Sequence, residues 1–189
     1  TIIPSLKQKL SDPSDIIDLQ NIKSLKGIYL SDNNQITIGA LNTHNEIAKS
    51  KVIKQYIKGL TYLASNIADN AVRNLGTIGG SICNSDPAAD YPSALLSLNA
   101  SILTNKRTIS AKDFFIDMFE TTLADDEIVV SVSFPIVKKS YYLKFASQAS
   151  KYAIVGIFGS YNNDLINFST KLEDVCIETV ESGKMTKDL

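Results

Sequence analysis

The residue types and spacings that suggest chemistry lie in one stretch, NLGTIGGSICNSDPAADYP, which runs from position 74 to position 92. Its adjacent glycines, Gly79 and Gly80, can adopt positive φ and leave room for a ligand to approach the main chain. Successive backbone N–H groups in such a bend form an anion-binding nest. Nearby hydroxyl and amide side chains can bond polyol or phosphate oxygens; they belong to Thr77, Ser81, Asn84 and Ser85. The stretch predicts a loop that lies along a long polar ligand.

Two carboxylates complete this stretch. Asp86 precedes Pro87, a pair typical of a turn. Asp90 accepts hydrogen bonds only when it is ionised, so it suits two hydroxyls of a ribose or ribityl chain. The alternative reading of the same residues is a glycine-rich connection between strands, because short glycine signatures are weak.

Composition excludes several classes of function. The formal net charge is -1 and no basic run occurs, so nothing favours nucleic-acid binding. The apolar runs are shorter than the roughly 20 residues that span a bilayer, and no leader opens the chain, which predicts a cytoplasmic protein without membrane insertion. Cys83 and Cys176 have no metal-type spacing, and His44 is the only histidine. We therefore expect no metal site and no catalytic side chain.

Three further groups have a structural and a chemical reading. His44 follows Thr43 at an expected helix start, which favours a capping or surface role over catalysis. The acidic run 125–127 is more typical of a solvated turn than of a metal site. Cys83 has no second cysteine nearby, which favours a buried small residue over a redox thiol.

The surrounding pattern predicts an α+β fold with a mixed or antiparallel sheet flanked by helices. We expect strands at residues 16–19, 25–30, 35–41, 101–104, 127–134 and 141–145. We expect helices at residues 60–67, 94–98 and 111–118, and a helix after Thr43, whose distance to Glu46 has capping-box spacing. Residues 164–180 carry an apolar stripe at helical spacing, made of Leu165, Phe168, Leu172, Val175, Cys176 and Val180.

Residues 72–90 resemble the second flavin-binding signature of the FAD subunit of molybdenum hydroxylases. This family includes the medium subunit of aerobic carbon monoxide dehydrogenase and the FAD domain of xanthine dehydrogenase. The resemblance extends over about residues 1–160. Its other matches are residues 38–48, Arg107 with Phe114, residues 122–123 and 126–128, Lys144-Phe145 and residues 152–155.

The resemblance implies the FAD-binding fold of molybdopterin dehydrogenases, truncated at both ends, and FAD as the cofactor. It implies electron transfer from iron–sulfur clusters of a partner subunit through FAD to an external acceptor. A 2Fe–2S subunit and a molybdopterin subunit are the implied partners, and their cofactors are not expected on this chain. The implied flavin contacts are Ile67, Thr77, Ile78, Gly79, Gly80, Ser81, Asn84, Asp86, Asp90, Ile128, Val129 and Lys144.

The chain departs from the family at both ends. Residues 1–4 match only the end of the family's first flavin loop, an Ala-Gly-Gly run followed by Thr/Ser-Leu-Ile-Pro, so we expect weak FAD binding or none. Residues 163–189 instead resemble a C-terminal segment of NADP-dependent isocitrate dehydrogenase. The expected parts are a remnant of an N-terminal FAD-binding subdomain (1–30), a central subdomain (31–136), the start of a C-terminal domain (137–162) and a helical tail (163–189). The alternatives to an FAD subunit are a flavin-free docking or assembly module and a composite that carries an isocitrate dehydrogenase fragment.

Overall fold

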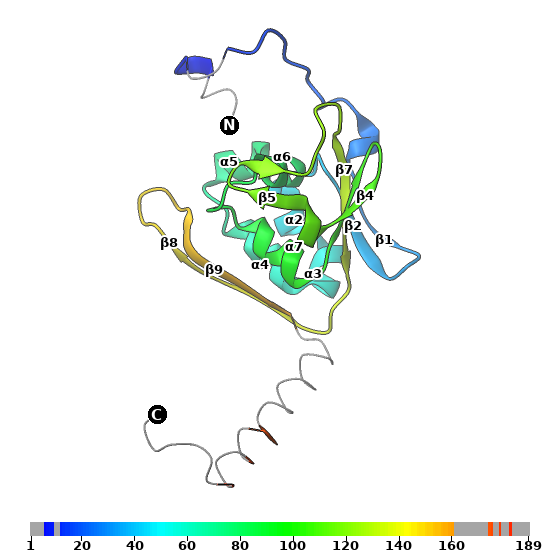
Figure 1. Cartoon of the computed structure of the whole chain (residues 1–189), viewed down its shortest axis with the longest axis vertical. Helices are drawn as coiled ribbons and strands as arrows, with labels where there is room; N and C mark the ends of the chain where they lie inside the picture. The colour runs from blue at the N-terminus through cyan, green and yellow to red at the C-terminus, as the bar shows by residue number, and fades with distance from the viewer. Residues whose placement is uncertain (1–5, 10–11, 161–173, 176–177, 179–181, 183–189) are drawn as a thin grey trace.

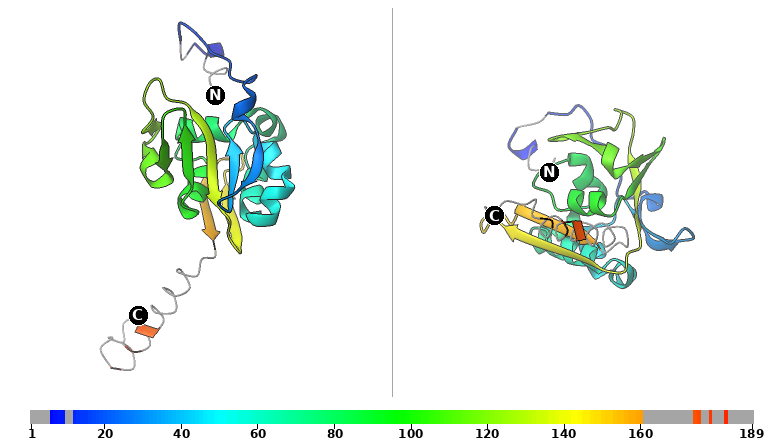
Figure 2. Two further views of the ribbon diagram at one scale, coloured as in Figure 1. Left: turned by 90° about the vertical axis from the view of Figure 1, so that its right-hand side faces the viewer. Right: turned by 60° about the horizontal axis from the view of Figure 1, so that its bottom comes forward.

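A five-stranded antiparallel sheet is the frame on which the helices are arranged (Figure 1). The computed structural model describes residues 6–9, 12–160, 174, 175, 178 and 182. The sheet has the strand order β1-β2-β7-β3-β4. Its strands are β1 (Ile28–Ser31), β2 (Gln35–Gly39), β3 (Ser101–Thr104), β4 (Thr108–Ser110) and β7 (Val129–Pro135). The helices lie against one face of this sheet, as the two views of Figure 2 also show.

The sheet has an apolar face and a hydroxyl face because its side chains alternate with period two. Ile38 pairs with Val132, which in turn pairs with Ile102, and all three are fully buried. On the opposite face, the hydroxyls of Thr37 and Ser133 lie 2.9 Å apart and share a hydrogen bond. The apolar face therefore forms the core together with the helices.

The helices are short, and four of them begin at a residue whose side chain caps the helix. The helices are η1 (Lys23–Leu25), α2 (His44–Lys49), α3 (Lys51–Tyr56), α4 (Lys58–Ser65), α5 (Asn70–Leu75), α6 (Ile78–Asn84), α7 (Tyr91–Ser97) and α8 (Ala111–Phe114). The predicted capping box at α2 is confirmed: Thr43 accepts from the backbone of Glu46, whose carboxylate accepts from the backbone of Thr43. In the described part of the chain, no helix has the length and apolar character needed to cross a bilayer.

Two small antiparallel hairpins complete the fold. The first pairs β5 (Phe115–Asp117) with β6 (Glu120–Thr121). The second pairs β8 (Ser140–Ala146) with β9 (Ala153–Ser160) and runs along the margin of the domain beside α4 (Figure 1). Its position is fixed in part by the amide of Gly59 in α4, which donates to Ser140 Oγ at 2.9 Å.

The expected α+β class with an antiparallel sheet and flanking helices is confirmed, but three local predictions are wrong. Residues 16–19 form no strand, and Ile16 and Ile17 are exposed. The helix expected over residues 111–118 ends at Phe114, and β5 follows it. The glycine stretch forms helix α6 instead of a loop. The tail helix expected over residues 164–180 falls almost entirely outside the described residues.

Candidate functional site

The glycine motif is the start of a short helix packed on the end of β2. Thr77 is the N-cap of α6, and its Oγ accepts from the amide of Gly80 at 3.1 Å. The next two amides are also engaged, because Ile78 donates to the carbonyl of Asn42 and Gly79 to that of Ala40. Neither glycine has positive φ. The predicted backbone nest is therefore wrong, since the amides that would form it already have partners inside the domain.

The first glycine of the pair is required for packing. A Cβ at Gly79 would lie 2.8 Å from the carbonyl oxygen of Ala40. A Cβ at Gly76 would likewise lie 2.7 Å from Nε2 of His44. At the exposed Gly80 it would meet only Oγ1 of Thr77, at 3.1 Å. Gly79 thus allows α6 to pack closely against the end of β2. Gly80 leaves no side chain on the outer surface of α6 at that position.

Helix α6 has two faces of different character. Ile78, Gly79 and Ile82 are buried and face the core. The predicted flavin contacts at Ile78 and Gly79 stay predictions. The outward positions, which we call the outer face of α6, are Thr77, Gly80, Ser81 and Asn84, all at least partly exposed. The hydroxyl of Thr77 accepts one hydrogen bond and retains its own hydrogen for donation. This face is the accessible part of the motif.

His44 contacts the residue before the glycine motif and the first residue of α7. Its backbone amide donates to the carbonyl of Gly76 at 3.0 Å, and its Nδ1 lies 3.2 Å from the hydroxyl of Tyr91. Burial, together with the nearby positive charge of Arg73, lowers the pKa of His44 to about 4. The ring is therefore neutral at pH 7. The expected surface role of His44 is wrong, because the residue is buried and Thr43 supplies the cap.

Asp90 is at the centre of a buried ionic cluster with Lys144 and Tyr142. The Lys144 ammonium lies 2.9 Å from Oδ1 of Asp90 and also donates to the carbonyl of Asn66 at 3.0 Å. The Tyr142 hydroxyl donates to Oδ1 of Asp90. Both charged side chains are less than a tenth exposed. The carboxylate of Asp90 is therefore buried and joins α7 to the β8–β9 hairpin. Its predicted contact with the ribose or ribityl hydroxyls stays a prediction.

The sequence reading missed Tyr142, although the signal was present. Residues 142 and 144 lie on the same face of the predicted strand, so period two places the tyrosine beside Lys144. The pKa of Tyr142 is raised above its ordinary value by burial and by the negative charge of Asp90. Gly156, opposite Lys144 in the hairpin, makes room for this tyrosine, because a Cβ there would lie 2.7 Å from its hydroxyl.

Three candidate residues lie on either side of α6 and make structural contacts: Ile67, Ser85 and Asp86. Ile67 packs partly buried against the core, and its carbonyl accepts from Arg73 at 2.6 Å. Ser85 has φ 46° and accepts at its carbonyl from the amide of Phe119, which ties β5–β6 to the end of α6. Asp86 accepts from the backbone of Ala88 at 2.8 Å in the predicted turn. The thiol of Cys83 is half-buried, and burial raises its pKa to about 11.

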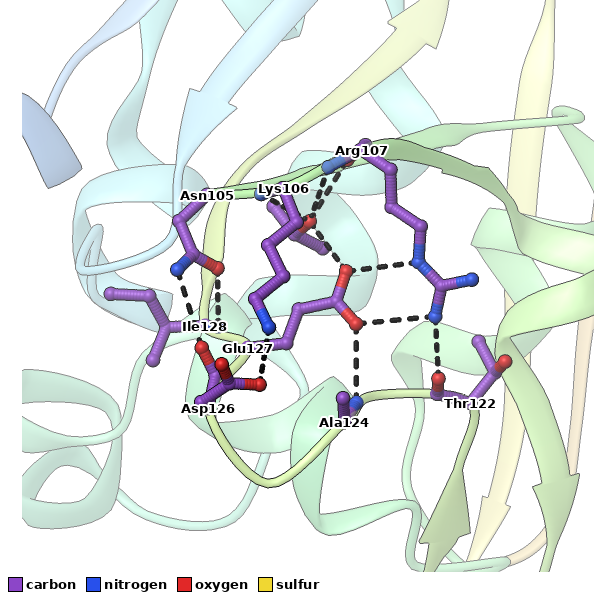
Figure 3. A network of polar contacts seen from close by, with 9 residues as sticks. Asn105, Lys106, Arg107, Thr122, Ala124, Asp126, Glu127 and Ile128 are labelled. Atoms are coloured by element: carbon purple, nitrogen blue, oxygen red, sulfur yellow. Dashed lines mark hydrogen bonds and ion pairs between the residues drawn. The ribbon is translucent and has the colours of Figure 1, made fainter.

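Ile128 belongs to a different polar network, which surrounds Glu127 (Figure 3), and Val129 follows it in the chain. Arg107 donates to both carboxylate oxygens of Glu127, at 3.0 and 3.1 Å. These bonds, with others from Thr104 Oγ1 and the amide of Ala124, lower the pKa of Glu127 to about 2. The expected solvated turn is therefore wrong for Glu127, whose carboxylate connects the β3–β4 turn to the segment before β7.

The two candidates beside this network differ in exposure. The Ile128 amide donates to Asn105 Oδ1 at 2.9 Å and its side chain is exposed, whereas Val129 is buried in β7.

In the described residues, no cluster of three or more His, Cys, Asp or Glu side chains could hold a metal ion. A shallow hollow elsewhere contains none of the candidate residues; it is lined by Ala48, Lys54, Lys58, Thr61, Tyr62 and Ser65.

Known proteins with related sequences and folds match most of the chain. The family model described as the FAD binding domain in molybdopterin dehydrogenase matches residues 1–137. The glyceraldehyde dehydrogenase medium chain of Sulfolobus acidocaldarius is 33% identical over 163 residues, which cover 83% of this chain and 58% of that protein. The carbon monoxide dehydrogenase medium chain of Hydrogenophaga pseudoflava is 30% identical over 139 residues, or 71% of this chain and 48% of that one.

Solved structures agree with these sequence matches. Carbon monoxide dehydrogenase from Hydrogenophaga pseudoflava superposes with a TM-score of 0.78 at 29% identity and covers 82% of this chain and 56% of its own. Quinoline 2-oxidoreductase from Pseudomonas putida 86 gives a TM-score of 0.77, also at 29% identity, with the same coverage. The chain thus spans about half the length of the relatives that it matches.

These matches define a flavin-binding domain. The chain belongs to the family of FAD-binding domains of molybdopterin dehydrogenases, and the expected family and its cofactor, FAD, are confirmed at that level. The resemblance of residues 163–189 to isocitrate dehydrogenase stays a prediction. The domain division also stays a prediction, although β1 (Ile28–Ser31) crosses its boundary after residue 30 and pairs with β2.

Proposed function

We propose that this chain is the FAD-binding part of the medium subunit of a cytoplasmic molybdenum hydroxylase. In this role it takes electrons from the iron–sulfur clusters of a partner subunit and passes them to an external acceptor, while a further partner subunit carries the molybdopterin. FAD supplies the redox chemistry when bound, and the protein supplies binding and orientation. The observation that carries the proposal is the family match over residues 1–137, which includes helix α6.

The outer face of α6 has the chemistry that the sugar and phosphate parts of FAD require. Its side chains are small and polar, and Gly80 has no side chain to prevent a ligand from lying on the helix. Because the first amides of α6 are engaged, the hydroxyls of Thr77 and Ser81 and the amide of Asn84 are the groups that would bond the ligand. Asp86 and the exposed Ile128 stay proposed contacts, as does Ile67.

Asp90 and Lys144 have a positioning role in this proposal. Their buried ion pair holds the β8–β9 hairpin against the start of α7, which follows the glycine motif. A carboxylate has about four lone-pair sites, so the bonds from Lys144 and Tyr142 leave Asp90 capacity for another donor. Val129 lies in the core of the sheet and supports Ile128.

A flavin-free docking module is the second candidate, and one observation favours it. The amides of Ile78 and Gly79 and the carboxylate of Asp90 are all engaged within the domain. A fold that is complete without a ligand in this way can serve as a scaffold for partner subunits. A visible absorption spectrum separates the two candidates, since only a flavoprotein retains flavin absorption after desalting.

The test of the FAD site uses the exposed glycine. Gly80→Leu places a bulky side chain on the outer face of α6 without entering the core, and Gln55→Leu is a matched change on the exposed side of α3. We expect FAD titration, followed by quenching of flavin fluorescence, to show at least about tenfold weaker binding for Gly80→Leu, a change of about 1.4 kcal/mol. Gln55→Leu should bind as the unmodified chain does. Equal affinity of all three proteins would refute the site, and a folded chain that retains no flavin at any concentration would favour the docking module.

A further inference from the structure

The β8–β9 hairpin has one buried face and one exposed apolar face. On the inner face, Tyr142 and Phe158 pair with each other and are buried against the domain. We call the opposite side the outer face of the hairpin; its large side chains are between 54% and 71% exposed and belong to Tyr141, Leu143, Phe145, Val155 and Ile157. In the β8–β9 register, Leu143 lies opposite Ile157 and Phe145 opposite Val155, so these side chains form one continuous patch.

A patch of this kind is typical of a covered surface. Contiguous apolar side chains on a folded protein mark contact sites, and a sheet of only two strands needs packing on its faces for independent stability. The inner face is already packed on α4 and α7. Among the described residues, no second layer covers the outer face.

The chain itself supplies a segment of matching size at the correct place. β9 ends at Ser160, at the end of the hairpin from which residues 161–189 continue. The apolar stripe begins five residues later at Leu165 and extends to Val180. As a helix, residues 164–180 would be about 25 Å long at about 1.5 Å per residue. The seven residues of β8 extend over about 23 Å at about 3.3 Å per residue, so the two lengths agree.

Charge also matches. A lysine lies near each end of the hairpin, Lys138 before β8 and Lys151 in the turn. Residues 164–181 contain five acidic residues and one lysine.

We propose that the apolar stripe of residues 165–180 packs on the outer face of the β8–β9 hairpin, so that the tail forms the second layer of a strand–strand–helix unit. Connection length favours this occupant, because consecutive elements joined by a short link pack next to each other. A second copy of the chain is the competing occupant. The proposal does not depend on FAD binding, and its test reads out no flavin.

The native Cys176 provides a direct test. In full-length chain with Cys83→Ala, single cysteines replace outer-face residues in four variants, Leu143→Cys, Phe145→Cys, Val155→Cys and Ile157→Cys. Tyr29→Cys, on exposed β1 of the other sheet, is the matched control. A disulfide requires Cα atoms within about 7 Å, so only a docked tail can react readily. We expect at least one outer-face variant to form an intramolecular disulfide at least about tenfold faster than the control.

The outcomes are distinct. The disulfide should disappear in a Cys176→Ser background. Rates equal to the Tyr29→Cys control in all four variants would overturn the proposal, and so would disulfides that link two chains and leave no intramolecular product. A second measurement leaves the hairpin unchanged. Leu172→Asp in the full chain should increase binding of the dye anilinonaphthalene sulfonate at least about twofold, because it uncovers the outer face. Unchanged dye binding with intact circular dichroism would also overturn it.

Discussion

At the scale of single residues, burial decides what each candidate side chain does. An aspartate, a lysine and a tyrosine each have a plausible ligand contact when read alone. In the structure Asp90 and Lys144 satisfy each other, and Tyr142 bonds the same carboxylate. A buried ion pair of this kind contributes little relative to apolar side chains of similar size, but removal of one member leaves an uncompensated charge.

Asp90→Ala should therefore destabilise the fold instead of only weakening a ligand contact. The Lys144 ammonium would lose its partner while it stays less than a tenth exposed. We expect a loss of about 3–5 kcal/mol in the free energy of unfolding, measured by urea denaturation. The double variant Asp90→Ala/Lys144→Met removes both charges and should recover part of this loss. If Asp90→Ala has the same free energy of unfolding as the unmodified chain, the ion pair does not contribute to stability in this way.

His44 should make stability depend on pH. The pKa is lowered to about 4 in the folded protein, against 6.5 for the ordinary group, so between these values the unfolded chain binds more protons. Its contribution is fully present above pH 6.5 and is lost as the pH falls towards 4, by up to about 3 kcal/mol. His44→Asn should flatten the dependence of the unfolding free energy in this window. The same slope in both proteins would assign it to other groups.

At the scale of elements, the sequence predicted most of the strands and the helices that correspond to α2, α4 and α7. Alternation at β2 and β7 and the capping box at Thr43 are local signals, and local signals are readable from one sequence. The glycine motif was misread because its two glycines suggested a flexible loop. What makes α6 a helix is the approach of Gly79 to Ala40, a contact between positions far apart in the sequence. Tertiary contacts of this kind are not encoded in spacing.

The two glycines of α6 should respond in opposite ways to the same change. Gly79→Ala drives a methyl group into the carbonyl of Ala40 and should cost about 1–3 kcal/mol. Gly80→Ala adds a methyl group near one movable side-chain atom on the surface. It should be neutral or stabilising by about 0.5–1 kcal/mol, because alanine favours helix. Thermal unfolding of the pair measures the difference, and equal midpoints would mean that α6 does not pack on β2 as described.

The hydrogen bonds to Glu127 should make the stability of the folded protein depend on pH in the acid range. Hydrogen bonds from Arg107, Thr104 and Ala124 lower the pKa of Glu127 to about 2, from an ordinary value of 4.5. Because a lowered carboxylate pKa stabilises the folded state above the unfolded value, this contribution is present above pH 4.5 and is lost as the pH falls towards 2. Glu127→Gln should lower the unfolding midpoint at pH 7 and make it less sensitive to pH in that window. Parallel pH profiles for the two proteins would contradict this role.

At the scale of the whole molecule, the sheet, the helical layer and the hairpin leave the outer face of α6 as the accessible part of the flavin motif. If FAD binds there, it binds the folded chain and not the unfolded one. Its addition at about 100 times the dissociation constant should then stabilise the fold by about 2.7 kcal/mol. In a chain of 189 residues, each kcal/mol raises the unfolding midpoint by about 2–4 °C. The expected rise is therefore about 5–10 °C in a thermal scan.

The concentration dependence of this shift separates weak binding from no binding. Weakened binding displaces the shift to higher FAD concentrations without abolishing it, because the stabilisation depends only on the ratio of ligand concentration to dissociation constant. In Gly80→Leu the shift should require at least about tenfold more FAD, while Gln55→Leu should follow the unmodified chain. Riboflavin lacks the phosphates and the adenosine, so it should give a smaller shift if the polar outer face of α6 binds the sugar-phosphate part. A midpoint that stays constant up to saturating FAD, in a chain with intact circular dichroism, would leave the fold without its proposed cofactor.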